Sequence, residues 1–309
     1  MTTISREMGL TDWASIVMLS ILWGGSYFFV GVAVADINPF LIVFGRVAIG
    51  ALVLGCAVRL AGVRMPMTVA YWRPLFMMSI LNNIVPWTLI TWGQTEIASG
   101  LAAILNATTP LFTVVLANRF TADEKLTPGK IAGIAIGIAG VVVLIGPDAL
   151  QGLGTAILAQ VAMLLASFPY AMSSVFARRF HDRPPVASAA GQMICSTVLM
   201  VPPVLAFAPP WAQAVPGPAS IAAILCLGVL STAFGYLLVF RILRSAGATN
   251  FSLVTFLLPV TAVVLGYMLL GERLDPRVFA GAGLIGLGLA AIDGRPAAML
   301  RRGLRGSRS

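Results

Sequence analysis

The motif EKLTP at residues 124–128 recurs as ERLDP at residues 272–276, and this repeated step in the sequence decides the fold. Ahead of each copy the chain matches itself again, because SILNNIVPW at 79–87 pairs with GVLSTAFGY at 228–236. An ordered series of matches at a nearly constant offset is the signature of an internal repeat. We therefore predict that the chain consists of two structurally related halves.

The composition places both halves in a membrane. Hydrophobic residues make up 59% of the 309 residues and charged residues only 10%, and the mean hydropathy is +0.94. An ordinary soluble domain carries about 25% charge, so a soluble globule is excluded. A helix needs about 20 apolar residues to cross a bilayer. Apolar runs broken by Pro, Gly and charge predict an all-α integral membrane protein with ten transmembrane helices, at 13–34, 39–61, 71–92, 97–119, 127–146, 153–178, 185–207, 218–240, 248–270 and 276–292.

Each half holds five of these spans, the first half at residues 13–147 and the second at 152–293. Because five is an odd number, the second half enters the membrane upside down relative to the first. The loop charges agree. The loop between the second and third spans carries three arginines, at 59–73, whereas its counterpart at 211–218 carries none. Two inverted five-helix repeats predict alternating access around a site near the midplane.

The positive charges also orient the chain. If the N-terminus is inside, seventeen of the twenty Lys and Arg residues fall on that side, while Arg273 and Arg277 lie opposite and Arg46 lies within a span. The positive-inside rule then places both termini in the cytoplasm, together with a basic tail at 294–309. Membrane orientation accounts for the net charge of +9. We therefore expect the lipid bilayer as a partner and no nucleic acid.

The repeated step itself has a local explanation. Thr127 and Asp275 suit the N-cap position, and the proline that follows each suits the first helical position, where no amide donor is needed. We expect Glu124 and Glu272 to act as caps near the membrane surface, or to pair with the basic residue that follows each of them.

Residue types that enzymes and metal sites need are scarce. His181 is the only histidine, and Cys56, Cys195 and Cys226 lie in apolar runs without metal-ligand spacing. We expect no metal, no cofactor and no catalytic residue, and no P-loop for ATP hydrolysis occurs. No Asp or Glu lies near the middle of a predicted span, where proton-driven carriers commonly place one. The sequence therefore favours facilitated transport.

Polar and aromatic side chains inside the spans indicate a binding site. Trp23, Ser26 and Tyr27 share one helical face of the first span, and both halves present such groups at equivalent depths. Facing a central cavity is one role for them; the alternatives are helix packing for Ser, Thr and Asn and an interfacial aromatic belt for Trp87. The candidate substrate-binding residues are Trp23, Ser26, Tyr27, Asn82, Asn83, Trp87, Asn106, Thr109, Tyr170, Ser173, Ser231, Thr232, Tyr236, Thr255 and Phe256.

Arg46 is the one charge well inside a predicted span. It is a candidate partner for a substrate carboxylate. A long side chain at that depth also reaches the membrane surface, and we expect this snorkelling, or bonding to backbone carbonyls, ahead of substrate binding.

These features together resemble the EamA type of the drug/metabolite transporter superfamily. The resemblance rests on the inverted duplication, WGGSYF at 23–28, Arg46 seven residues after Pro39, and the repeated Glu-basic-Leu-x-Pro step. It implies that the first, third, fourth, sixth, eighth and ninth spans enclose the substrate cavity. The chain departs from the common pattern in its second half, where Tyr170 stands at the usual Trp and Gln192 at the usual Arg.

The resemblance further implies a bacterial inner-membrane exporter of amino acids and related metabolites, aromatic amino acids among them. We therefore expect a secondary transporter, not an enzyme, that exports a small organic molecule by alternating access and works as a monomer. Two alternatives stay open: a multidrug or metabolite efflux carrier coupled to protons, and a membrane-embedded enzyme.

Overall fold

Ten helical spans account for most of the described part of the chain. The computed structural model describes residues 8–120, 126–146, 154–180 and 182–293. Within them, ten spans are long and apolar enough to cross a membrane, and no strand occurs. The predicted spans are thereby confirmed. The predicted tail at 294–309, and the predicted half boundaries at 147 and 152, lie outside the described residues.

Several spans consist of more than one helical element. In chain order, the elements are α1 (Leu10–Ala33), α2 (Pro39–Leu60), α3 (Val69–Ser79), the π-helix η1 (Ile80–Ile84), α4 (Val85–Gly93), α5 (Ser99–Asn106), α6 (Thr109–Phe120), α7 (Pro128–Ile145), α8 (Thr155–Phe176), the 3-10 helix η3 (Ala177–Phe180), α9 (Pro185–Phe207), the 3-10 helix η4 (Pro210–Ala212), α10 (Pro218–Cys226), the π-helix η5 (Leu227–Phe234), α11 (Gly235–Ser245), α12 (Gly247–Phe251), α13 (Leu253–Leu270) and α14 (Pro276–Asp293).

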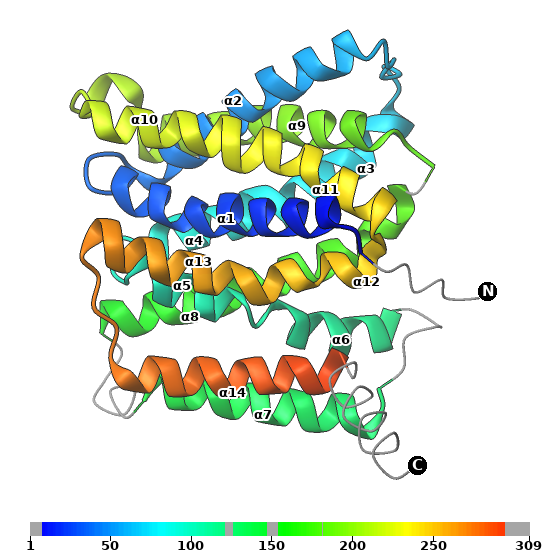
Figure 1. Cartoon of the computed structure of the whole chain (residues 1–309). Coiled ribbons are helices and arrows are strands. Elements are labelled where there is room, and N and C mark those ends of the chain that lie inside the picture. The colour runs from blue at the N-terminus through cyan, green and yellow to red at the C-terminus, as the bar shows by residue number, and fades with distance from the viewer. Residues whose placement is uncertain (1–7, 121–125, 147–153, 181, 294–309) are drawn as a thin grey trace.

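The spans lie side by side, and equivalent spans of the two halves meet (Figure 1). α7 and α14, the fifth and tenth spans, pack together along one edge of the bundle, and α2 packs with α9 toward the opposite edge. The first span of each half packs on the fourth span of the other half, since α1 contacts α13 and α8 contacts α5 and α6. The fold is therefore the predicted pair of inverted five-helix repeats.

The predicted helix starts after the repeated step are also found. α7 begins at Pro128, and Thr127 caps it by accepting a hydrogen bond from the Lys130 amide. α14 begins at Pro276, and Asp275 accepts a hydrogen bond from the Arg277 amide at 2.8 Å. Each proline therefore occupies the first turn of its helix, where a backbone N–H has no hydrogen-bond acceptor within the helix and its absence costs nothing.

Glycines let α7 and α14 touch along their backbones. A Cβ on Gly288 would lie 2.5 Å from the carbonyl oxygen of Gly133, and a Cβ on Gly281 would lie 2.7 Å from that of Gly140. Membrane helices have no hydrophobic drive to associate in lipid, so small residues that permit close packing hold them together. The two helices form a tight peripheral pair.

Two π-helices occupy equivalent places in the two halves. η1 interrupts the third span and η5 the eighth, and both fall in the stretches that match each other in the sequence. A π-turn changes the face on which side chains emerge, and such turns are frequent at functional sites. Asn82 and Asn83 lie in η1, and Ser231 and Thr232 lie in η5.

The fourth span is broken where predicted site residues lie. α5 ends at Asn106 and α6 begins at Thr109, beside Pro110. Proline has no amide hydrogen and clashes with the preceding turn, which explains the break. The predicted ninth span, 248–270, is divided at Ser252 into the short helix α12 and the membrane-crossing helix α13.

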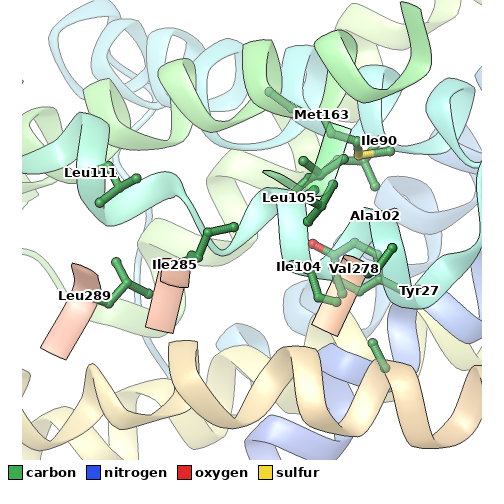
Figure 2. Close-up of a cluster of buried hydrophobic side chains, with 14 residues drawn as sticks. Tyr27, Ile90, Ala102, Ile104, Leu105, Leu111, Met163, Val278, Ile285 and Leu289 are labelled. Carbon is green, nitrogen blue, oxygen red and sulfur yellow. The ribbon is translucent and has the colours of Figure 1, made fainter. Parts of the chain in front are cut away.

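A buried apolar cluster surrounds α5 (Figure 2). Leu105 of α5 and Met163 of α8 are fully buried in it, and Ile90 of α4 and Tyr27 of α1 join them. Removing a large side chain from such a core costs about 2–5 kcal/mol. Because Ile90 and Tyr27 also line the cavity described next, the cluster fixes one of its walls.

Candidate functional site

A cavity of about 410 Å³ lies between the two halves. It is lined by the six spans that the resemblance implies, and by Arg46 from the second span in addition. Most of the predicted site residues line it: Trp23, Ser26, Tyr27, Asn82, Trp87, Asn106, Thr109, Tyr170, Ser173, Ser231, Thr232, Tyr236 and Thr255.

Two predicted residues do not line the cavity. Asn83 is fully buried, and its Nδ2 donates a hydrogen bond to Oγ of Ser196 at 2.9 Å, which ties η1 to α9. Phe256 packs instead against the apolar cluster around α5. Asn83 therefore joins helices, the packing role that the sequence left open.

Other lining residues were not among the predicted set. Gln94 lies at the end of α4, two turns after Trp87, and helical periodicity places it on the same face as Trp87. Phe251 of α12 also lines the cavity and meets Trp23 edge to face, with ring centroids 6.0 Å apart. No pattern in the sequence points to Phe251, because it lies in the short helix α12, before the break at Ser252. Met78, Val254 and Leu258 add apolar surface.

Asn82 is the centre of a polar network that spans both halves. Its Nδ2 donates to the hydroxyl of Tyr236 at 2.9 Å, and its Oδ1 accepts from Oγ of Ser173 at 3.1 Å. The amide of the first half thereby links α11 and α8 of the second. Both the donor and the acceptor of Asn82 are used, so its orientation is fixed.

Trp23 forms a second connection between the halves. Its Nε1 donates to the backbone carbonyl of Ser231 in η5 at 3.2 Å. Gly235 makes room for the indole, because a Cβ there would lie 2.8 Å from Trp23 Nε1. The ring is thus held against the wall while its face remains part of the cavity lining.

Arg46 points into the cavity and does not snorkel to the surface. Its guanidinium carbon lies 3.7 Å from the centroid of the Trp87 ring, and its Nε donates to Oγ1 of Thr232 at 2.9 Å. Gly50, one turn later on α2, permits this approach, since a Cβ there would lie 2.9 Å from Cγ2 of Thr232. A cation over an indole face is attracted by the ring electrons. These contacts hold the side chain inward against its tendency to reach water.

Several buried polar atoms of the lining lack a partner in the described part of the chain. They are Oδ1 of Asn106, Oγ of Ser231, and both side-chain polar atoms of Gln94. Leaving a buried donor or acceptor unpaired costs about 1–3 kcal/mol. Polar groups kept unpaired in a cavity wall are therefore candidates to bind a ligand.

Two carboxylates close one end of the bundle, which we name the Asp36 end. Asp36, between α1 and α2, accepts hydrogen bonds from the Gly217 amide at 2.9 Å and from Oγ of Ser220 at 2.8 Å. Each of these donors belongs to the start of α10. A residue of the first half thus caps a helix of the second.

Glu272 makes the reciprocal connection, which we name the Glu272 cap. Its carboxylate accepts from the Ser99 amide at 2.7 Å, from Oγ of Ser99 at 2.9 Å and from the Gly100 amide at 3.2 Å. These donors form the N-terminus of α5, where a negative charge is favourable. Of the two roles predicted for Glu272, the structure selects capping over pairing with Arg273. Glu124 lies outside the described residues.

The two ends of the cavity differ in exposure. Val30 and Gln94, toward the Asp36 end, are buried, whereas Ser174, toward the opposite end, is exposed. The cavity is therefore closed at the Asp36 end, while toward the other end exposed Ser174 stands beside buried Val239 and Val254.

Asp36 gives the closed end a dependence on pH. The pKa of Asp36 is held below its usual value, first by the hydrogen bond from Ser220 and second by that from the Gly217 amide. The contacts stabilise the closed end above the usual pKa of Asp, about 4, and this stabilisation disappears as pH falls through the lowered pKa.

We expect the melting temperature of the wild-type protein to fall more steeply on acidification than that of Asp36→Asn between about pH 5 and about pH 3. Thermal unfolding of the purified protein in detergent measures this difference. Ser220→Ala, which keeps the carboxylate and removes its main donor, should give an intermediate slope. Identical slopes for all three proteins would contradict the role of Asp36.

The sequence is similar to those of known transporters. The EamA-like transporter family matches the chain twice, at residues 13–146 and 157–292. The uncharacterized inner membrane transporter YedA of Escherichia coli is 28% identical over 285 residues, which cover 88% of this chain and 87% of that protein. A probable terminal-alkyne amino-acid exporter of Streptantibioticus cattleyicolor is 25% identical over 288 residues, covering 92% of this chain and 93% of the relative.

A solved structure, described only as the crystal structure of a protein, has the same fold. It aligns with a TM-score of 0.65 at 20% sequence identity, covering 91% of this chain and 97% of the other.

Proposed function

The chain belongs to the EamA-like transporter family, and from this premise we propose that it exports small organic metabolites, amino acids including aromatic ones among them. Export proceeds by alternating access through the cavity between two repeats, assigned to residues 13–147 and 152–293. The observation that carries the proposal is the cavity itself, which has aromatic walls, a few unpaired polar groups and one closed end. Binding sites for small molecules have this composition.

The proposed location is the bacterial inner membrane, with both termini in the cytoplasm. The bias of seventeen of twenty basic residues supports this orientation, and YedA is named as an inner membrane protein. In this orientation the Asp36 end of the cavity faces outward and Ser174 lies toward the cytoplasm. Export requires that substrate enter from the cytoplasmic side. One copy of the chain encloses the whole cavity, so we propose a monomer.

Amino acids are proposed as cargo because a relative over nearly the whole chain is named as a probable amino-acid exporter. The aromatic side chains of the lining, Trp23, Trp87, Tyr170 and Tyr236, suit a molecule with a flat apolar part. The proposed substrate-binding residues are the predicted residues that line the cavity, with Arg46 and Gln94 added.

Facilitated transport is proposed as the mechanism. Among the described residues that line the cavity there is no Asp or Glu, the side chain that proton-driven carriers commonly use. A proton-coupled multidrug carrier is the rival, and it predicts accumulation of solute against its gradient when only a pH difference is imposed.

Uptake of labelled phenylalanine and alanine into proteoliposomes, with no ion gradient imposed, tests the proposal. Saturable equilibration faster than in empty liposomes is expected. Accumulation driven by a pH difference alone would contradict the facilitated mechanism, and an absence of flux for every amino acid would contradict the proposed cargo.

Tyr236→Phe is expected to lower the initial rate of phenylalanine flux about three- to tenfold, since one hydrogen bond contributes about 0.5–1.5 kcal/mol. The change removes the hydroxyl that accepts a hydrogen bond from Asn82 and leaves the ring in place. Tyr267→Phe is the matched control, because that tyrosine is 67% exposed and does not line the cavity. Equal rates for the two variants would remove Tyr236 from the proposed site.

A further inference from the structure

The cavity carries an unbalanced charge. Among the described residues that line it, Arg46 is the only Lys or Arg, and no Asp or Glu accompanies it. The guanidinium of an arginine is not deprotonated in proteins. The other lining groups are neutral amides, hydroxyls and aromatic rings. The cavity thus holds one fixed positive charge and no described side chain to neutralise it.

The guanidinium also has free donors. Its Nε is used by Thr232, and one of its faces is covered by Trp87. Within the described part of the chain no acceptor is recorded for its Nη groups. Arg presents paired N–H donors in a planar fork that matches the two oxygens of a carboxylate. Because Trp87 and Thr232 already fix the side chain, little further ordering is needed when a carboxylate binds.

We propose that the cavity selects small organic carboxylates of net negative charge over zwitterions, with the carboxylate paired to Arg46. This inference rests on the proposed function and narrows its substrate class. Preferred cargo is an acid whose amino group is acylated or missing, carried on an apolar or aromatic body that contacts Trp87 and Tyr170. Free amino acids are weaker substrates of the same site.

Burial in the cavity disfavours a substrate that carries a free ammonium group. A charge removed from water needs a partner of opposite charge, and it loses several kcal/mol of hydration when it has only neutral ones. The neutral acceptors Oδ1 of Asn106 and Oε1 of Gln94 are available. They offer an ammonium hydrogen bonds without charge. A carboxylate, by contrast, meets a full positive charge, and the filled cavity becomes electrically neutral.

The size of the cavity permits such cargo. Its volume of about 410 Å³ lies in the range of small-molecule sites, roughly 300–1,000 Å³. An aromatic ring with a short acidic chain fits this volume, and ring stacking adds to the pairing of charges.

Three compounds with one phenyl ring and different charges test the inference. N-acetylphenylalanine is an anion, phenylalanine a zwitterion, and phenethylamine a cation. Equilibrium binding of each to the purified full-length protein is measured at pH 7 by competition with radiolabelled N-acetylphenylalanine. We expect N-acetylphenylalanine to bind at least about tenfold more tightly than phenylalanine, and phenethylamine to bind more weakly than both.

Variants at Arg46 distinguish the effect of its charge on binding from an effect on folding. Arg46→Gln should lower the affinity for N-acetylphenylalanine by at least about tenfold and abolish its advantage over phenylalanine. Arg46→Lys, which keeps the charge without the fork, should keep the order of the compounds at reduced affinity. Arg241→Gln, an exposed arginine outside the cavity, is the matched control and should bind like the wild type. Each Arg46 variant should melt at the same temperature as Arg241→Gln, which verifies that it is folded.

Two results would overturn the inference in distinguishable ways. If phenylalanine binds as tightly as N-acetylphenylalanine, or Arg46→Gln leaves their order unchanged, the preference for anions is wrong while amino-acid export stands. If no compound binds and no amino acid crosses proteoliposomes, the proposed function fails and the inference fails with it.

Discussion

Glu272→Gln is expected to make the Asp36 end of the cavity at least about tenfold more accessible from solution, because a hydrogen bond to a charged group contributes about 1.5–3 kcal/mol and each 1.4 kcal/mol is a factor of ten. The carboxylate accepts three hydrogen bonds from Ser99 and Gly100 at the start of α5. An amide at this position loses the negative charge and one of the two acceptor oxygens. The helix N-terminus then repels the side-chain NH₂ group that replaces the second oxygen.

The rate of maleimide labelling at Gln94→Cys measures this opening. Gln94 is buried toward the closed end, and the reporter requires a background in which Cys56, Cys195 and Cys226 are replaced. Purified protein in detergent is used, so that membrane orientation does not affect the result. We expect faster labelling in the Glu272→Gln protein than in the parent.

Two further variants control the experiment. Gly266→Ala keeps the carboxylate but places a Cβ against Oε2 of Glu272, so it should also speed labelling. Glu96→Gln removes an exposed carboxylate at the same end and should have no effect. If neither Glu272→Gln nor Gly266→Ala changes the labelling rate, the Glu272 cap does not close this end.

Gly288→Ala is expected to destabilise the protein by about 1–3 kcal/mol, the usual cost of overpacking. The added methyl group would lie 2.5 Å from the carbonyl oxygen of Gly133 and 2.7 Å from the amide nitrogen of Gly137. Both are backbone atoms and cannot rotate away. α7 and α14 must therefore separate, and the close contact along their length is lost.

Thermal unfolding in detergent measures the effect, and Gly286→Ala on the same helix is the matched control. A Cβ on Gly286 meets nothing within 4 Å. Alanine favours a helix over glycine by about 1 kcal/mol, so the control should melt at the wild-type temperature or above it. A Gly288→Ala protein as stable as this control would show that the contact between α7 and α14 tolerates a side chain.

The duplicated architecture could be predicted because local features of the sequence determine it. Apolar length defines the spans, proline after Thr127 and Asp275 starts the fifth and tenth spans, and the loop charges reveal the inversion. None of these requires a distant contact. The partner of Glu272, in contrast, lies across the bundle at Ser99, and only the packing of α13 against α5 brings the two together.

The faces of the site helices could be predicted only where the helices are regular. Trp23, Ser26 and Tyr27 lie in the unbroken α1, and all three line the cavity as their spacing indicates. In the third span the π-turn of η1 changes the angle between successive residues. Asn82 therefore faces the cavity and Asn83 faces α9, although in a regular helix Asn83, four residues before Trp87, would share the face of Trp87.

The direction of Arg46 could not be predicted, since reaching the surface and facing the cavity suit the same position in the sequence. Thr232 and the Trp87 ring decide the matter, and both come from other spans. Gln192, which matches Arg46 in the second half, is buried and does not line the cavity. The repeat is thus symmetric in backbone and asymmetric in charge.

This asymmetry has an electrical consequence. If an anion pairs with Arg46 and leaves the cell without a counter-ion, each transport cycle moves one negative charge outward. In the proposed orientation, a membrane potential that is negative inside then favours export by about 2.3 kcal/mol for every 100 mV, or roughly 40-fold in concentration. A carrier with a single buried guanidinium would be driven by voltage, and it would need neither a proton gradient nor a carboxylate to sense one.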